Sequence, residues 1–220
     1  MKTRSWNPLV FGAMLMLSVP ACVSVNMERG SPARRYFVLR LDGAPVTTRA
    51  NGSGVLKLNG VRVAPPYNGK GFVYRLGPQV FETDFYNQFL AAPAAMISDE
   101  LGEVLRRSNL FKHVVNSGSA VEATHLLEAT VGTLYGDFSQ QGAGNAVLEM
   151  SFIMTRDSAN KPQVIFQKSY EKTLPLQERS PEALVRAWSR ALEQITAALI
   201  SDLKEAGKAS DLVGTQVTPR

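Results

Sequence analysis

A single cysteine constrains this chain more than any other residue, because it excludes an internal disulfide bond. Cys22 is the only cysteine among the 220 residues, so a folded domain must be held by apolar packing and hydrogen bonds alone. The composition permits this, since 45% of the residues are apolar and 20% are charged. Such a chain can bury a core, which excludes wholly disordered and low-complexity classes. Its length is typical of one domain with appendages.

The cysteine ends a segment with the features of a targeting sequence. Lys2 and Arg4 give it a positive start, and residues 9–17 form an apolar run that is too short to cross about 30 Å of hydrocarbon comfortably. An aliphatic residue three positions before Cys22 and a small residue directly before it resemble a bacterial lipobox, in which cleavage precedes an acylated cysteine. We therefore predict a lipoprotein signal peptide at 1–21 and lipidation of Cys22.

The alternative for this segment is an ordinary secretory signal that is cut after Ala21 and leaves an incidental cysteine. If Cys22 is lipidated, its two or three acyl chains would hold the protein firmly, since stable anchoring takes two lipid signals. No aspartate stands directly after the cysteine, and in the sorting tendency of bacterial lipoproteins this favours the outer membrane. We expect a lipid-anchored protein at the outer membrane, with its domain facing the periplasm.

The charge of the chain gives no sign of a nucleic-acid partner. The formal net charge of +5 falls to +3 when Lys2 and Arg4 leave with the signal peptide. A protein that binds nucleic acid needs a clustered basic face, and so small a charge over the mature chain does not indicate one.

Alternating apolar residues predict strands in two groups. The first group covers residues 36–41, 56–63 and 72–76, and the second covers 127–135, 148–154 and 164–174. Gly60 lies where the alternation changes phase, which predicts a β-bulge, and Pro65 follows the end of that strand. We expect 72–76 to form a hairpin with the strand before it, and the second group to form an antiparallel meander. The aromatic-rich segment 78–92 starts as a short strand.

Two segments have the spacing of amphipathic helices. The first begins at Pro93, which suits a first helical turn. The second begins with Ser180 as N-cap and Pro181 at the first helical position, and we expect Gly207 to end it. The helical positions that we expect to be buried are Ile97, Leu101, Val104, Leu105 and Ser108 in the first helix, and Leu184, Trp188, Leu192, Ile195, Leu199 and Leu203 in the second.

Together these elements predict an α+β fold. It would be a mostly antiparallel β-sheet with two amphipathic helices packed on one face, in the order β-β-β-α-β-β-β-α. The domain would occupy residues 35–206. A lipidated tether at 22–34 would precede it, and a flexible C-terminal tail at 207–220 would follow.

The chain lacks the sequence patterns of catalysis and metal binding. His113 and His125 are the only histidines. They lie in different elements without a cysteine or paired carboxylate at ligand spacing, which argues against a zinc site. The sequence also has no phosphate-binding glycine loop and no nucleophile elbow. We expect no enzyme, no metal and no cofactor apart from the covalent lipid on Cys22.

Aromatic residues are concentrated between residues 72 and 89. The simpler interpretation is that they cover a sheet edge and one end of a helix. The alternative is a contact surface for a protein or an acyl chain, since aromatic residues and arginine are typical of interface centres, and Arg75 could bind a carboxylate or phosphate there. The candidate partner or lipid contacts are Tyr74, Arg75, Phe81, Phe85, Tyr86 and Phe89.

Several short motifs resemble one family of envelope proteins. They are Tyr-Phe-Val-Leu at 36–39, Val-Arg-Val-Ala-Pro-Pro-Tyr at 61–67, Phe-Val-Tyr-Arg at 72–75, Phe-Tyr-Asn-Gln-Phe-Leu at 85–90 and Ser-Asn-Leu-Phe at 108–111. With the lipobox, they make the chain similar to the ABC-type transport auxiliary lipoproteins, the PqiC-like group, over roughly residues 34–205.

The resemblance implies a non-catalytic accessory lipoprotein of an intermembrane transport system. Its partner would be an MCE-domain protein, which moves phospholipid or other hydrophobic substrates across the periplasm with an ABC ATPase and permease. Homo-oligomers around such a conduit would be compatible with this role. Two alternatives stay open: an outer-membrane assembly or envelope-integrity factor that binds a membrane protein by strand addition at a sheet edge, and a hydrolase or hydrolase activator acting on peptidoglycan.

Overall fold

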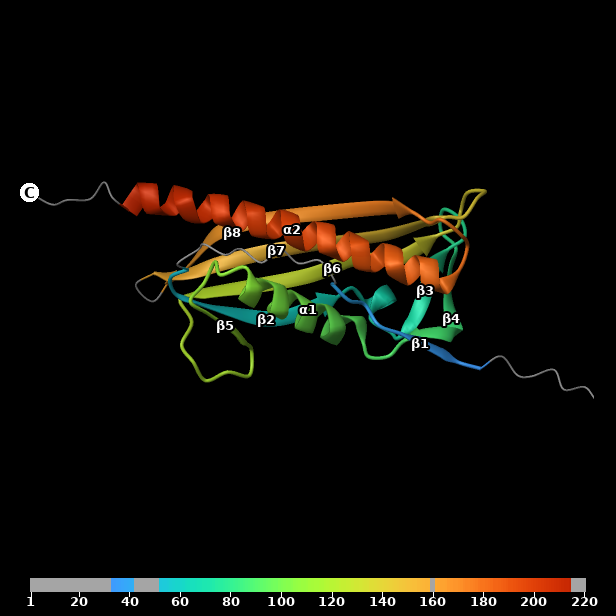
Figure 1. Ribbon diagram of the computed structural model, residues 1–220, viewed down its shortest axis with the longest axis horizontal. Helices are drawn as coiled ribbons and strands as arrows, with labels where there is room; N and C mark the ends of the chain where they lie inside the picture. Colours follow the sequence, from blue (N-terminus) through green and yellow to red (C-terminus); the bar gives the residue numbers. More distant parts are fainter. Residues whose placement is uncertain (1–32, 42–51, 159–160, 215–220) are drawn as a thin grey trace, which may run out of the picture. The chain divides into compact units, whose positions relative to one another are not determined.

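Eight strands form one mixed sheet in the computed structural model, which describes residues 33–41, 52–158 and 161–214 (Figure 1). The strands are β1 (Arg35–Phe37), β2 (Val55–Val63), β3 (Gly71–Arg75), β4 (Phe81–Phe89), β5 (His113–Asn116), β6 (His125–Asp137), β7 (Asn145–Ser158) and β8 (Lys161–Pro175). Cys22 and the predicted signal peptide lie outside the described residues, so these predictions stay predictions.

The long strand β6 is the centre of this sheet. Along one edge it pairs with β7, and β7 pairs with β8, both in antiparallel register. This confirms the predicted meander. Along its other edge β6 pairs in parallel first with β2 and then, at Gly136 and Asp137, with β3. β5 extends the sheet beyond β2, whereas β4 and then β1 extend it beyond β3.

The predicted bulge at Gly60 is confirmed. The register between β2 and β6 shifts between Leu58 and Val61, and Gly60 has a φ of 73°. This left-handed conformation is one that glycine adopts at little steric cost. A short 3₁₀ helix, η1 (Pro65–Tyr67), follows the strand, which ends where the two prolines cannot donate to the sheet.

Two helices cover one face of the sheet (Figure 1). α1 (Pro93–Arg107) packs on β2 and β5, and α2 (Pro181–Gly214) packs on β7 and β8. The N-cap of α2 is the predicted one, because the Ser180 hydroxyl accepts a hydrogen bond of 3.2 Å from the Ala183 N–H. No helix among the described residues is long and apolar enough to span a bilayer.

Both predicted helical stripes are confirmed as core. Each predicted residue is buried: Ile97, Leu101, Val104, Leu105, Ser108, Leu184, Trp188, Leu192, Ile195, Leu199 and Leu203. Trp188 lies at the centre of an aromatic cluster, with ring centroids 5.2 Å from Phe72 and 5.6 Å from Phe89. Its indole N–H also donates to the Tyr135 carbonyl at 3.3 Å, so the one polar atom of this side chain is satisfied.

The predicted hairpin between β2 and β3 is wrong. β3 pairs antiparallel with β4 and parallel with β6, and β2 also runs parallel to β6. The chain does not reverse after β2. The Ala64 N–H donates to the Val131 carbonyl of β6 at 2.9 Å, and η1 then connects β2 to β3 while the chain keeps its direction beside β6. β2 and β3 therefore occupy successive stretches of the same edge.

The α+β class and the one-sided helix layer are confirmed, with more strands than the predicted order contains. β4 extends through the whole aromatic segment, and β5 adds a strand after α1, so the described order is ββββαββββα with η1 omitted. The predicted end of α2 at Gly207 is also wrong, since the helix continues to Gly214. A single glycine weakens a helix by about 1 kcal/mol and does not have to end it.

Candidate contact surface on the β1–β4 arm

Strands β1, β4 and β3 form one end of the strand order, which we call the β1–β4 arm. Strand β4 carries a large bulge opposite β3. Gly71 pairs with Gln88, whereas Val73 pairs with Thr83. The residues from Asp84 to Asn87 therefore have no register partner on β3, and within this stretch Asn87 pairs with Arg35 of β1. Such bulges re-aim side chains and locally end strand pairing.

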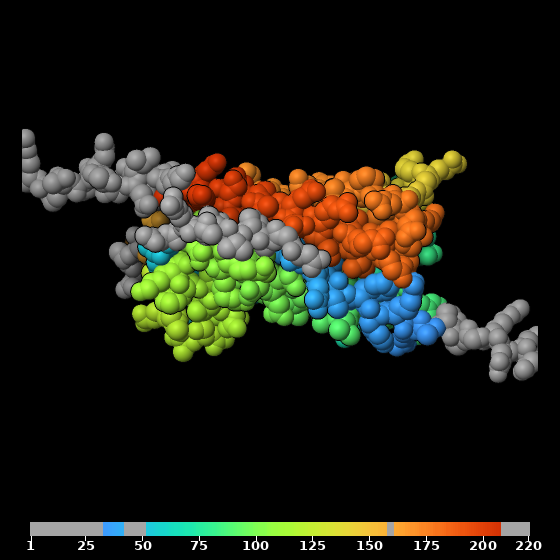
Figure 2. Space-filling view, viewed as in Figure 1, coloured from blue at the N-terminus to red at the C-terminus, as the bar shows by residue number. Residues whose placement is uncertain are grey.

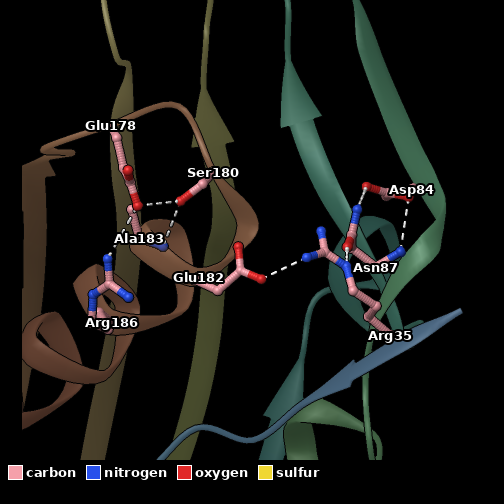
Figure 3. Close-up of polar contacts among 8 residues, drawn as sticks. All are labelled: Arg35, Asp84, Asn87, Glu178, Ser180, Glu182, Ala183 and Arg186. Atoms are coloured by element: carbon pink, nitrogen blue, oxygen red, sulfur yellow. Dashed lines mark hydrogen bonds and ion pairs between the residues drawn. The ribbon is translucent and has the colours of Figure 1, made fainter.

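One carboxylate holds this bulge together. Asp84 accepts hydrogen bonds from the backbone N–H of Asn87 at 2.9 Å and from the Asn87 side-chain amide at 2.7 Å (Figure 3). The backbone N–H of Tyr86 also donates to it, at 2.8 Å. A fourth comes from the Tyr74 hydroxyl at 2.6 Å. Burial alone would raise the pKa of Asp84, but these donors outweigh it and lower that pKa. Burial and the hydrogen bond to Asp84 raise the pKa of Tyr74.

The bulge presents two aromatic rings to solvent. Phe85 is 58% exposed and Tyr86 is 41% exposed. Their ring centroids are 5.3 Å apart in a perpendicular arrangement, and the guanidinium carbon of Arg34 lies 4.0 Å from the Phe85 centroid. These two residues are accessible, as a contact surface requires.

Phe81 belongs to the opposite face of the sheet from the helices. Its ring lies 5.7 Å from that of Tyr135, in a perpendicular arrangement. Gly136 faces Leu184 of α2, so its neighbour Tyr135 points away from the helices. Phe81 is 46% exposed, and it caps a small cluster on this face that contains Val73, Tyr135 and Val147 with Tyr67 packed against it.

Arg75 is already neutralised by a carboxylate. Its guanidinium forms a two-point ion pair with Asp137, with a distance of 3.1 Å between Nε and Oδ1, and it lies 5.2 Å from the Tyr135 ring centroid. The hydrogen bond from Arg75, joined by those from Ser139, lowers the pKa of Asp137 to about 2. This pairing leaves Arg75 as a structural part of the surface.

Phe89 differs from the other candidate residues because it is in the core. Only 2% of it is exposed, and its ring contacts Phe72 at 4.7 Å and Trp188 at 5.6 Å. The bulge shifts the alternation of β4, which directs Phe89 inward under α2. A partner cannot reach it in this fold.

Sequence reasoning missed an ion pair that joins β1 to the start of α2. The Arg35 guanidinium lies 2.6 Å from a Glu182 carboxylate oxygen and donates to the Asn87 side chain at 3.0 Å (Figure 3). At the same end of α2, Glu178 accepts from the Ser180 hydroxyl at 2.9 Å and lies 3.5 Å from Arg186. Because Arg35 and Glu182 are far apart in sequence, no local pattern could have indicated this contact.

The two histidines do not meet. His125 lies against Phe111 and accepts a hydrogen bond from Arg156 at 3.2 Å, and burial with the charge of Arg156 lowers its pKa. His113 is exposed on β5. Within residues 33–41, 52–158 and 161–214, no three His, Cys, Asp or Glu side chains are grouped as metal ligands would be.

The sequence of this domain matches one known family. The family model described as ABC-type transport auxiliary lipoprotein component matches residues 37–200. The chain belongs to this family. The match runs from the end of β1 into α2, so this auxiliary lipoprotein carries all of its candidate contacts, from Tyr74 to Phe89, inside the family domain.

Solved structures share the fold of this auxiliary lipoprotein. A crystal structure of a DUF330-family protein from Xanthomonas campestris has a TM-score of 0.64 at 16% identity, covering 82% of this chain and 98% of that one. A crystal structure of an uncharacterized protein has a TM-score of 0.61 at 15% identity, with coverage of 78% and 99%. At such identities the likeness concerns the fold alone. No curated protein matches the chain in sequence.

Proposed function

We propose that this auxiliary lipoprotein is a non-catalytic subunit of a transporter that combines an MCE-domain protein with an ABC ATPase and permease. The transporter would move phospholipid or another hydrophobic substrate between the inner and outer membranes. Lipidated Cys22 would anchor the subunit in the outer membrane, and the domain would face the periplasm. The family match over residues 37–200 carries this proposal, because it defines an auxiliary lipoprotein of ABC-type transport.

The partner contact in this proposal is the exposed face around Phe81. A half-exposed aromatic ring on a rigid sheet is the kind of anchor that dominates protein interfaces. The ring packs against Tyr135 and the cluster below it, so it is already ordered before a partner binds. Preorganised side chains of this kind reduce the entropy cost of association.

The pairing of the polar residues supports a non-catalytic role. Arg75 forms an ion pair with Asp137, and the Asp84 carboxylate accepts hydrogen bonds from the Tyr74 hydroxyl and the Asn87 N–H of the bulge. A hydrolase needs a nucleophile with a positioned base beside it. These carboxylates instead hold the strands of the arm together.

One observation favours the alternative of an envelope-assembly factor that works by strand addition. β8 is paired only on its β7 side among the described strands, and it runs for 15 residues. Val164 on this strand is 56% exposed. A long edge strand can accept a further strand from a membrane protein.

Co-purification from membranes tests the proposed function. The full-length protein with a C-terminal tag should recover an MCE-domain protein, and Phe81→Ser should reduce that recovery several-fold. Val164→Ser, at a position of similar exposure on β8, should leave it unchanged. Recovery of an outer-membrane barrel protein that is lost with Val164→Ser would overturn the proposal in favour of the alternative.

A further inference from the structure

A second group of exposed apolar side chains lies along β1. We call Tyr36, Phe85, Tyr86 and Leu90 the β1 ridge; Tyr36 is 53% exposed and Leu90 is 57% exposed. Tyr36 pairs with Gln88 of β4, and the Leu90 N–H donates to the Phe37 carbonyl at 2.8 Å. The ridge therefore follows the β1–β4 pairing at the edge of the sheet.

Basic residues flank the β1 ridge. Among the described residues, Arg34, Arg40 and Lys70 form no ion pair. Arg34 stacks on Phe85, and the Lys70 ammonium donates to the Leu90 carbonyl at 3.1 Å. Positive charge is thus interleaved with the exposed rings.

The positive surface continues from β1 onto α2. Figure 2 shows residues 33–41, in blue, beside the orange N-terminal part of α2. A groove of about 430 Å³ lies here, lined by Val38, Arg40, Val185, Arg186, Ser189, Arg190 and Glu193. Arg186 is already paired with Glu178 at 3.5 Å, and Glu193 adds a carboxylate to the lining. Arg40 and Arg190 form no ion pair among the described residues, so these two guanidinium groups can accept an anionic headgroup.

The ridge is held in place by the contacts already described. Asp84 fixes the bulge that carries Phe85 and Tyr86, and Arg35 joins β1 to both Asn87 and Glu182 (Figure 3). The folded arm therefore keeps these rings exposed to water. Hydration of this apolar surface is unfavourable, and a partner that covers the rings would relieve it.

The position of the ridge in the chain indicates its occupant. Only residues 23–32 separate Cys22 from the first described residue, Ala33. Ten residues span at most about 35 Å when fully extended. A lipid on Cys22 would keep β1 within this distance of the membrane, closer in chain length than any other strand.

We propose that the β1 ridge docks the domain on a bilayer surface that carries anionic phospholipid headgroups. Aromatic rings with polar edges suit the membrane interface, and arginine and lysine near an anionic surface add electrostatic attraction. The proposal rests on the lipid anchor of the proposed function for its geometry. It adds a second membrane contact that would set the orientation of the domain, with Phe81 left free for the partner.

Fluorescence quenching tests this contact with the full-length, lipidated protein. Phe85→Trp and Val164→Trp place a probe at matched exposures of 58% and 56%, and the unmodified protein gives the signal of buried Trp188. The vesicles contain phosphatidylethanolamine and phosphatidylglycerol with brominated acyl chains. We expect the probe at position 85 to be quenched several-fold more than the probe at 164. Equal quenching at both positions, or none at 85, would overturn the proposal.

Charge variants test the anionic part of the proposal. In the Phe85→Trp background, Arg34→Gln with Lys70→Gln should reduce quenching several-fold. The charge-matched control, Lys112→Gln with Lys161→Gln, changes residues near β5 and β8 and should have no effect. Quenching that the first pair does not change would contradict docking on anionic headgroups.

Two further outcomes distinguish membrane docking from self-association and from the transport role. Shielding of the probe at 85 without vesicles, rising with protein concentration, would overturn the proposal because a second copy would be the occupant. The vesicles contain no transporter, so the result does not depend on the MCE partner. If the probe is not quenched but the MCE-domain protein is still recovered, only the ridge proposal is rejected. If the probe is quenched but no MCE-domain protein is recovered, the proposed function is rejected and the membrane contact is kept.

Discussion

At the scale of single residues, Asp84 determines the shape of the candidate surface. Its carboxylate accepts from two backbone N–H groups, the Asn87 amide and the Tyr74 hydroxyl. Removing it leaves these donors without a partner in a half-buried site. We expect Asp84→Ala to lower the free energy of unfolding by about 2 kcal/mol, measured by urea denaturation. Glu82→Ala, at an exposed neighbour, should change it by less than about 0.5 kcal/mol. Equal losses would mean that the network does not hold the bulge.

The pair of Arg75 and Asp137 makes a prediction about pH. The pKa of Asp137 is lowered from its ordinary 3.8 to about 2 in the folded state, so its stabilising contribution is present above about pH 4 and is lost as the pH falls through about 2. Arg75 is partly exposed, and after solvent screening we expect Asp137→Asn to cost on the order of 1 kcal/mol at pH 7. In urea denaturation at several pH values, this difference should shrink towards pH 2. A difference that stays constant with pH would contradict the role of the charge.

At the scale of elements, the bulge in β2 depends on the backbone conformation of Gly60. A Cβ at Gly60 or at Gly69 would meet no atom within 4 Å, but only Gly60 has a positive φ. We expect Gly60→Ala to lower the free energy of unfolding by about 1–2 kcal/mol. Gly69→Ala should be neutral or slightly stabilising, because it restricts the unfolded chain. Thermal or urea denaturation of the two variants measures the difference, and equal effects would contradict a conformational cause.

Local patterns predicted the elements better than their pairing. Every residue that helical spacing assigned to the two stripes is buried, and the phase change at Gly60 identified the bulge, because both signals are contained in a few neighbouring residues. The pairing of β3 with β4 and β6 depends on the direction in which the chain continues after η1, and no short sequence pattern specifies that direction.

The candidate surface was only partly predictable for the same reason. Phe85 and Phe89 belong to one strand, but the bulge between them breaks the alternation, so sequence alone did not separate the exposed ring from the buried one. Arg75 and Asp137 are 62 residues apart, and their ion pair depends on the pairing of β3 with β6.

At the scale of the whole molecule, the arm carries two groups of exposed apolar side chains. The Phe81 face lies over Tyr135, on the side of the sheet away from the helices. The β1 ridge follows the edge strand next to the N-terminal segment. In the proposed arrangement the ridge rests on the membrane and the Phe81 face receives the MCE-domain protein.

Photo-crosslinking in cells tests the central proposal of an MCE partner most directly. A photoreactive residue replaces Phe81, Val164 or, as a buried control, Trp188 in the full-length protein, and mass spectrometry identifies the adducts. We predict an adduct with an MCE-domain protein from position 81 and none from 164 or 188. A barrel-protein adduct from position 164, or no adduct from 81, would contradict the proposed partnership.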